Sequence, residues 1–241
     1  PVLIGLEKQY LELQVAIVEL ASSHVSTDKL LQDATLAISH MKHHPTLKKV
    51  IFNDMMTDNL KRQDQIVKAL RKVISGKETA DFYLMFQPKL ELATNTIVGF
   101  EALARLKVDG LGNVPPPEFI AIAENELLIF DLGMTILQQV CQFVEKLQQA
   151  GYANISVAVN ISGHQLLRED FLTKIKDCMR GHKDCKTLLE FEITESVLFE
   201  HYEQVNNILG EIQKMGIAPV AKDTAAKVAA PVQKNTLKKQ V

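Results

Sequence analysis

The sequence has little of what marks several classes of protein: few cysteines, almost no net charge and no long apolar run. No two of its three cysteines (Cys141, Cys178 and Cys185) have the spacing of a zinc-binding CxxC motif, which fits a reduced, cytosolic compartment. The formal net charge of -2 gives no electrostatic argument for nucleic-acid binding. No apolar run is long enough to span a bilayer and no secretory leader is visible, so we expect no membrane segment in this chain.

The sequence is rich in apolar residues, and they follow an alternation of strand-like and helix-like patterns. Apolar residues make up 46% of the 241 residues, enough for one large domain or two smaller ones. Apolar runs with strand alternation precede stretches with helical periodicity, and this order is typical of an α/β fold. The pattern predicts strands at 82–89, 97–106, 155–160 and 187–193, and helices at about 117–124, 131–150, 168–179 and 200–214.

Oxygen-bearing side chains recur at the ends of three of these strands. They are Glu101, Asn160 and Glu192, each in or directly after an apolar run. In a parallel barrel the carboxyl ends of the strands form the face where the chemistry takes place. Two carboxylates and one amide oxygen suit a hard divalent cation. The alternatives are a solvent-facing glutamate and an asparagine that satisfies backbone groups.

Five sequence blocks carry a family resemblance. The chain resembles the first half of an EAL domain, the cyclic di-GMP phosphodiesterase module of bacterial signal transduction. The blocks, in the family's order, are FQP (86–88), IVGFEALARL (97–106), PPPEFIAIAENELLIFDLGMTIL (115–137), VAVNIS (157–162) and LEFEITES (189–196).

The resemblance implies a fold, a reaction and a set of site residues. The fold would be α/β, a partial TIM-type (β/α) barrel of the EAL kind with an antiparallel first strand. The reaction would be hydrolysis of one phosphodiester bond of cyclic di-GMP, with Mg²⁺ or Mn²⁺ as cofactor. Glu101, Asn160 and Glu192 would bind the metal, Gln87, Leu103 and Arg105 would bind the substrate, and Glu195 would brace the loop after its strand.

The sequence departs from the family pattern after Ile217. Where the family has two adjacent aspartates, this chain has Lys222 and Asp223, and the glycines that follow in the family are missing. A lysine there removes a metal ligand and adds a repelling charge. We therefore expect a truncated EAL domain at 79–220 that is inactive by itself, followed by a Lys/Ala-rich tail at 221–241 that stays disordered.

The region before the EAL-like part resembles the end of a GGDEF (diguanylate cyclase) domain. A strand within 11–20, a helix capped by Ser26 or Thr27, and a strand at 48–54 predict a small α+β remnant over 1–54. A helix with mixed charges then predicts a linker over 55–78.

Three functions remain open. The first is a cyclic di-GMP phosphodiesterase region, the second a non-catalytic cyclic di-GMP receptor or protein-interaction module, and the third an inactive product of a truncated gene. An open half-barrel exposes a strand edge, so a homodimer is one expected arrangement. We expect a cytoplasmic chain, and attachment of its parent protein to the inner membrane stays open.

Overall fold

The computed structural model describes residues 2–4, 7–9, 13–19, 26–43, 46–77, 81–182, 185–194 and 202–222. The chain divides into two compact units between Lys68 and Ala69. Within the described ranges, no helix is long and apolar enough to cross a membrane.

The first unit consists of short strands and two helices. Strands β1 (Val2–Ile4) and β2 (Glu7–Gln9) form an antiparallel pair, and β3 (Val15–Ile17) pairs in parallel with β4 (Lys49–Ile51). Helix α1 (Thr27–His43) starts at the predicted cap, where the Ser26 hydroxyl accepts a hydrogen bond from the Lys29 backbone nitrogen at 3.3 Å. A small core joins Ala37 and Met41 to β4 and to α2 (Asp54–Ile74). The likeness of this region to a GGDEF domain stays a prediction.

The second unit is built on one sheet. Strands β5 (Phe82–Glu91) and β6 (Thr96–Val108) form an antiparallel hairpin, and β7 (Gly112–Val114) pairs with the end of β6. Strands β8 (Ser156–Ile161), β9 (Leu189–Thr194) and β10 (Ala218–Lys222) continue the sheet in parallel with β6, so the strand order is β10-β9-β8-β6-β5. The EAL-type arrangement, with an antiparallel first strand, is confirmed.

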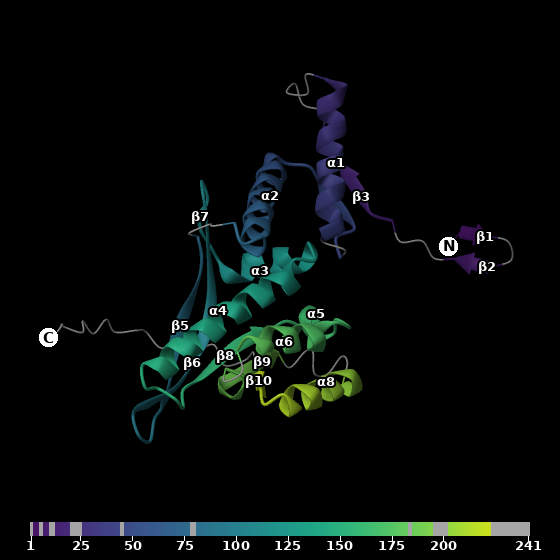
Figure 1. The fold of residues 1–241 in the computed structure, drawn as a ribbon. Coiled ribbons are helices and arrows are strands. Elements are labelled where there is room, and N and C mark those ends of the chain that lie inside the picture. The colour runs from purple at the N-terminus through teal and green to yellow at the C-terminus, as the bar shows by residue number, and fades with distance from the viewer. Residues whose placement is uncertain are drawn as a thin grey trace. The chain divides into compact units, whose positions relative to one another are not determined.

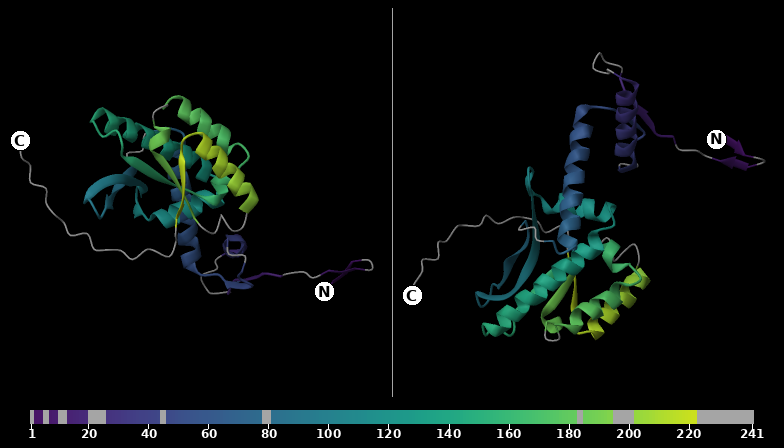
Figure 2. Two further views of the ribbon diagram at one scale, coloured as in Figure 1. Left: turned by 90° about the horizontal axis from the view of Figure 1, so that it is seen from below. Right: turned by 45° about the horizontal axis from the view of Figure 1, so that its top comes forward.

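Helices cover one face of this sheet (Figures 1 and 2). Helix α3 (Pro116–Asn125) leads into α4 (Ile129–Gln149), and α5 (Gly163–Leu166), α6 (Phe171–Arg180) and α8 (Tyr202–Lys214) follow the strands in turn, with a 3₁₀ turn at Lys186–Leu188. The core contains the alternate residues of the strands that face these helices, among them Val157, Val159, Leu189, Phe191 and Ile193. The opposite face carries polar side chains such as Glu101 and Glu192, beside apolar ones such as Leu103 and Val220.

The boundaries of the predicted elements agree with the structure to within a few residues. The structure adds strands β1, β2, β7 and β10 and the short helix α5, which were absent from the predicted map. Ala221 and Lys222, which we had assigned to the tail, are strand residues of β10. The rest of that tail, from residue 223 onward, lies outside the described residues.

Candidate functional site

The register of the parallel strands puts the three predicted ligands on one face of the sheet. Glu101 of β6 stands opposite Ala158 of β8, and Asn160 of β8 stands opposite Glu192 of β9. Side chains two residues apart share a face, so Asn160 lies on the same side as Glu101. Their neighbours Ala102 and Val159 point to the other face and belong to the core under the helices.

One side-chain contact and the strand register bring these residues together. The amide nitrogen of Asn160 donates to the Oε1 atom of Glu101 at 3.0 Å. Glu192, whose side chain is only 8% exposed, is the register neighbour of Asn160 on the next strand. Glu101, Asn160 and Glu192 thus lie side by side on three adjacent strands, β6, β8 and β9.

The chemistry of this set fits a hard cation. An ionised carboxylate can only accept hydrogen bonds, so the amide nitrogen must be the atom of Asn160 that faces Glu101. The amide oxygen is then on the other side of the group, and oxygens are the ligands that Mg²⁺ and Mn²⁺ prefer. In the described residues, no three His, Cys, Asp or Glu side chains gather as a metal cluster, so the candidate set is two carboxylates and one amide.

The predicted substrate-binding residues lie on the same face of the β5–β6 hairpin. Gln87 stands directly opposite Glu101, Leu103 opposite Met85, and Arg105 opposite Tyr83. Because the two strands alternate in step, Gln87, Glu101, Leu103 and Arg105 share one surface. This surface runs from the candidate metal ligands to the end of β6.

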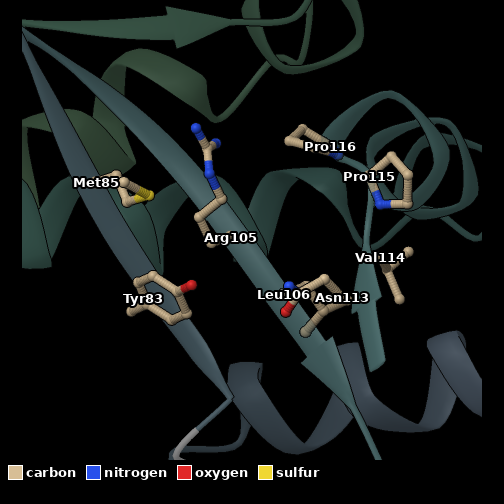
Figure 3. Close-up of a pocket in the computed structure, with 8 residues that line it drawn as sticks. All are labelled: Tyr83, Met85, Arg105, Leu106, Asn113, Val114, Pro115 and Pro116. Carbon is tan, nitrogen blue, oxygen red and sulfur yellow. The ribbon is translucent and has the colours of Figure 1, made fainter. Parts of the chain in front are cut away.

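Arg105 lines a pocket of about 340 Å³ at that end of β6. Figure 3 shows its guanidinium between Met85 of β5 and Pro116 at the start of α3. One of its nitrogens donates to the Ala104 carbonyl at 2.9 Å, which leaves donors of the planar group for a ligand. Gln87 and Leu103 lie outside the lining of this pocket, which also includes Tyr83, Leu106, Asn113, Val114 and Pro115.

A cluster that the sequence analysis missed lies on the same face. The ammonium of Lys89 on β5 contacts Glu190 Oε2 and Glu192 Oε1 on β9, both at 2.9 Å. Burial lowers the pKa of Lys89, but the hydrogen bonds and charges of the two carboxylates outweigh it and raise the pKa above 10.5. Burial likewise acts to raise the pKa of Glu190, and hydrogen bonds from Ser156 and Lys89 outweigh it, so that pKa lies below 4.5.

Period-two alternation was the signal that could have revealed this cluster. Lys89 is two residues after Gln87, and Glu190 is two residues before Glu192, so each shares a face with a residue that we had singled out.

The edge strand β10 completes the described part of the face. Val220 stands opposite Glu192 and is 39% exposed, and the backbone of Lys222 pairs opposite Thr194. Lys222 is thus in strand register at the carboxyl end of β10, the position where the family resemblance expects an aspartate. Glu195, the predicted loop-bracing residue, and Asp223 lie outside the described residues.

The EAL domain family model matches residues 67–233 of the chain. The chain belongs to the EAL domain family. The match begins inside the segment 55–78 that we had expected to be a linker helix, and the domain bounds 79–220 stay a prediction.

Curated relatives of this EAL chain are longer proteins. The uncharacterized protein y4lL of Sinorhizobium fredii is 31% identical over 207 residues, which cover 86% of this chain and 24% of that protein. The signaling protein YkoW of Bacillus subtilis is 34% identical over 140 residues, 58% of this chain and 17% of that protein. The bifunctional diguanylate cyclase/cyclic di-GMP phosphodiesterase MucR of Pseudomonas aeruginosa is 25% identical and is covered to 27%. The chain therefore spans about a quarter or less of these relatives.

Solved EAL structures share the fold. The phosphodiesterase PaMucR in complex with c-di-GMP superposes with a TM-score of 0.62 at 24% identity, over 69% of this chain and 66% of that one. The EAL enzyme Bd1971, bound to cAMP and cyclic di-GMP, superposes with a TM-score of 0.61 at 22% identity, over 86% of this chain and 54% of that one. These similarities confirm the TIM-barrel-like α/β class.

Proposed function

We propose that this chain is part of a cyclic di-GMP phosphodiesterase and that the polar face of its sheet binds cyclic di-GMP with a divalent cation. One observation carries the proposal: Glu101, Asn160 and Glu192 occupy adjacent strands of one face, and Asn160 donates to Glu101 at 3.0 Å. Family membership supports it, because MucR and NbdA of Pseudomonas aeruginosa, both matched by this chain, are named as cyclic di-GMP phosphodiesterases.

The cation would be held by Glu101, Asn160 and Glu192. EAL phosphodiesterases are in general dependent on a divalent metal, and we propose Mg²⁺ or Mn²⁺ here because all three ligands are hard oxygen donors. When bound, such a cation lowers the pKa of a coordinated water and polarises a phosphoryl oxygen. The hydrogen bond from Asn160 keeps the Glu101 carboxylate directed toward β8 before any ligand arrives.

Arg105 would hold a phosphate of the cyclic dinucleotide. Its planar guanidinium can donate two parallel hydrogen bonds to one phosphate, which fixes both position and orientation. Gln87, directly across the hairpin from Glu101, would contact the ligand beside the metal ligands. Leu103 would supply an apolar contact on the same surface, and Glu195 would brace the loop after β9.

A second candidate is a receptor that binds cyclic di-GMP without hydrolysing it. The observation that favours it is Lys222, in register at the carboxyl end of β10 where the family resemblance expects a carboxylate. A positive charge there would repel a second divalent cation, and a two-metal hydrolysis would then fail although binding remained.

Binding and turnover are measured separately to test the two candidates. Calorimetric titration with cyclic di-GMP in Ca²⁺ is expected to give saturable binding that Arg105→Ala weakens. Chromatography of the reaction with Mn²⁺ then follows the linear dinucleotide in the wild type and in Lys222→Asp. Turnover in the wild type supports the enzyme, whereas binding with turnover gained only in Lys222→Asp supports the receptor.

Two results would contradict these assignments. Absence of saturable binding in the wild type, with circular dichroism showing a folded chain, would contradict both candidates. Binding that Arg105→Ala leaves unchanged would contradict the assigned phosphate contact alone.

A further inference from the structure

One ion-pair cluster crosses the polar face of the sheet from one edge to the far strands. Lys89 is on the edge strand β5, and its partners Glu190 and Glu192 are on β9. Strands β6 and β8 lie between them in the sheet order. Three strand spacings span roughly 14 Å in a flat sheet. The long side chains of Lys89 and the two glutamates cover part of this span, and a sheet that curls around this face, as in a partial barrel, shortens the rest to give contacts at 2.9 Å.

Small residues on the intervening strands make room for the crossing. Gly99 stands opposite Lys89 on β6, and Ser156 stands opposite Gly99 on β8. A Cβ atom on Gly99 would lie 2.7 Å from the Ser156 hydroxyl oxygen, closer than real Cβ contacts come. Ser156 in turn hydrogen-bonds the Glu190 carboxylate. The Lys89 side chain thus crosses the sheet over Gly99 and Ser156, and Ser156 also hydrogen-bonds Glu190, one of the two partners of Lys89.

The two partners of Lys89 differ in their other roles. Glu192 is one of the three proposed metal ligands, and its side chain is 8% exposed. Glu190 lies two residues earlier on the same face, at the level of Ser156 and Ala158, and its side chain is 24% exposed. A divalent cation would therefore bind one partner of Lys89, Glu192, and leave the other, Glu190, available to Lys89.

We propose that Lys89 is an internal counterion for the metal ligand Glu192, and that it passes wholly to Glu190 when a divalent cation binds. The inference rests on the proposed metal site. Without the cation, Lys89 keeps the buried Glu192 carboxylate paired and oriented, because an unpaired buried carboxylate is strongly disfavoured. With the cation bound to Glu192, the ion pair with Glu190 keeps the Lys89 ammonium paired. Lys89 is thus a positioning residue that also competes with the metal.

This arrangement predicts opposite effects for the two ends of the ion pair. Lys89→Met removes the competitor, so the dissociation constant for Mn²⁺ is expected to fall by on the order of tenfold. Glu190→Gln removes the alternative anionic partner, so Lys89 stays paired with Glu192 and the dissociation constant for Mn²⁺ is expected to rise several-fold. Lys89→Arg keeps the charge and is expected to stay near the wild type.

The measurement is a Mn²⁺ titration followed by the electron paramagnetic resonance signal of the free ion. Lys214→Met is the matched control, because Lys214 is 75% exposed and pairs only locally with Glu211. Melting without metal is the second readout: Lys89→Met is expected to melt at a lower temperature than the wild type and to show a larger upward shift with Mn²⁺. A purely structural lysine would lower the melting temperature without tightening the metal.

The outcomes separate this inference from the proposed function. Wild-type binding that Glu192→Ala abolishes and Lys89→Met tightens supports both. Wild-type binding that Lys89→Met leaves equal or weaker overturns the counterion exchange and leaves the metal site standing. A rise in affinity in Glu190→Gln would also overturn it. Mn²⁺ binding in none of the variants would remove the proposed metal site and the exchange together.

Discussion

Gly133 of α4 is predicted to be a glycine that an alanine cannot replace, although it lies inside a helix. A Cβ atom at Gly133 would stand 1.8 Å from the Nε2 atom of Gln165. Gln165 is 3% exposed, and that nitrogen donates to the Ile129 carbonyl at 3.0 Å. Its Oε1 atom accepts from the Ser162 backbone nitrogen at 2.9 Å as part of the capping box that starts α5. The clash therefore falls on the side chain that ties α5 to the first turn of α4.

The magnitude follows from two opposing terms. Replacing a glycine by alanine inside a helix stabilises it by about 1 kcal/mol. The end of a glutamine chain can rotate away, but doing so here breaks two hydrogen bonds in a buried place, at about 1.5 kcal/mol each. The cost outweighs the gain, so Gly133→Ala is expected to lower the free energy of unfolding by about 2 kcal/mol.

The assay is urea unfolding followed by circular dichroism, with two comparisons. Gly210→Ala in α8 is the matched control, because no atom lies within 4 Å of the added Cβ, and it is expected to stabilise by up to about 1 kcal/mol. In a Gln165→Ala background the clash partner is gone, so Gly133→Ala should become neutral or stabilising. The reasoning is refuted if Gly133→Ala is as stable as the wild type, or costs the same in both backgrounds.

Three further predictions concern the polar face and the core. Arg105→Ala is expected to raise the Kd for cyclic di-GMP at least about tenfold in calorimetry, whereas the exposed Arg180→Ala should not, and equal values would contradict the phosphate contact. Glu101→Gln is expected to weaken Mn²⁺ about tenfold by paramagnetic resonance, and unchanged binding would remove Glu101 from the ligand set. The hydrogen bond between the Cys141 and Cys185 thiols at 2.9 Å, together with burial, raises the pKa of the Cys141 thiol above 9.0. Its contribution to stability is thus complete below pH 9.0 and lost as the pH rises from there toward the folded pKa; Cys141→Ala should flatten this alkaline loss in urea midpoints, and an unchanged slope would contradict it.

The regular elements could be predicted because their signals are local. The β5–β6 hairpin pairs in register from Phe82 to Lys89, shifts register between Lys89 and Leu90, and turns at Asn95, which has a φ of 53° that asparagine tolerates. The helices carry long apolar stripes. Strand β10 gives no such signal, since its five residues include Pro219 and two alanines, which are poor strand formers. It is a strand because β9 offers a parallel edge, and a proline is tolerated on an edge strand.

The same contrast holds for the site: some of its residues could be predicted from local sequence patterns, whereas others depend on contacts between distant parts of the chain. Asn160 and Glu192 could be predicted because each lies near the end of a parallel strand, and parallel strands bring their carboxyl ends together. Glu101 lies in the middle of β6 and reaches the same face through the register of β6 with β8. The contact from Lys89 to Glu192 joins residues 103 positions apart and depends on how far the sheet curls. Curvature comes from the packing of the whole sheet, and no short pattern encodes it. The missing carboxylate at Lys222, by contrast, was visible only by comparison with the family motif.

The charges on this face bear on how many cations the described residues can hold. Among the candidate metal ligands and the Lys89 ion pairs, Glu101, Glu190 and Glu192 carry three negative charges and Lys89 carries one positive charge, which leaves an excess of two. Arg105, farther along the same face, is set apart from this sum as the proposed phosphate contact. That excess neutralises one divalent cation and no more, because a second would leave an uncompensated double charge near a partly buried site. Lys89 then sets the affinity for this cation, because it must exchange its ion pair with Glu192 for the one with Glu190 when the cation binds. A two-metal hydrolysis therefore requires carboxylates beyond this set, whereas binding of cyclic di-GMP around one cation requires none.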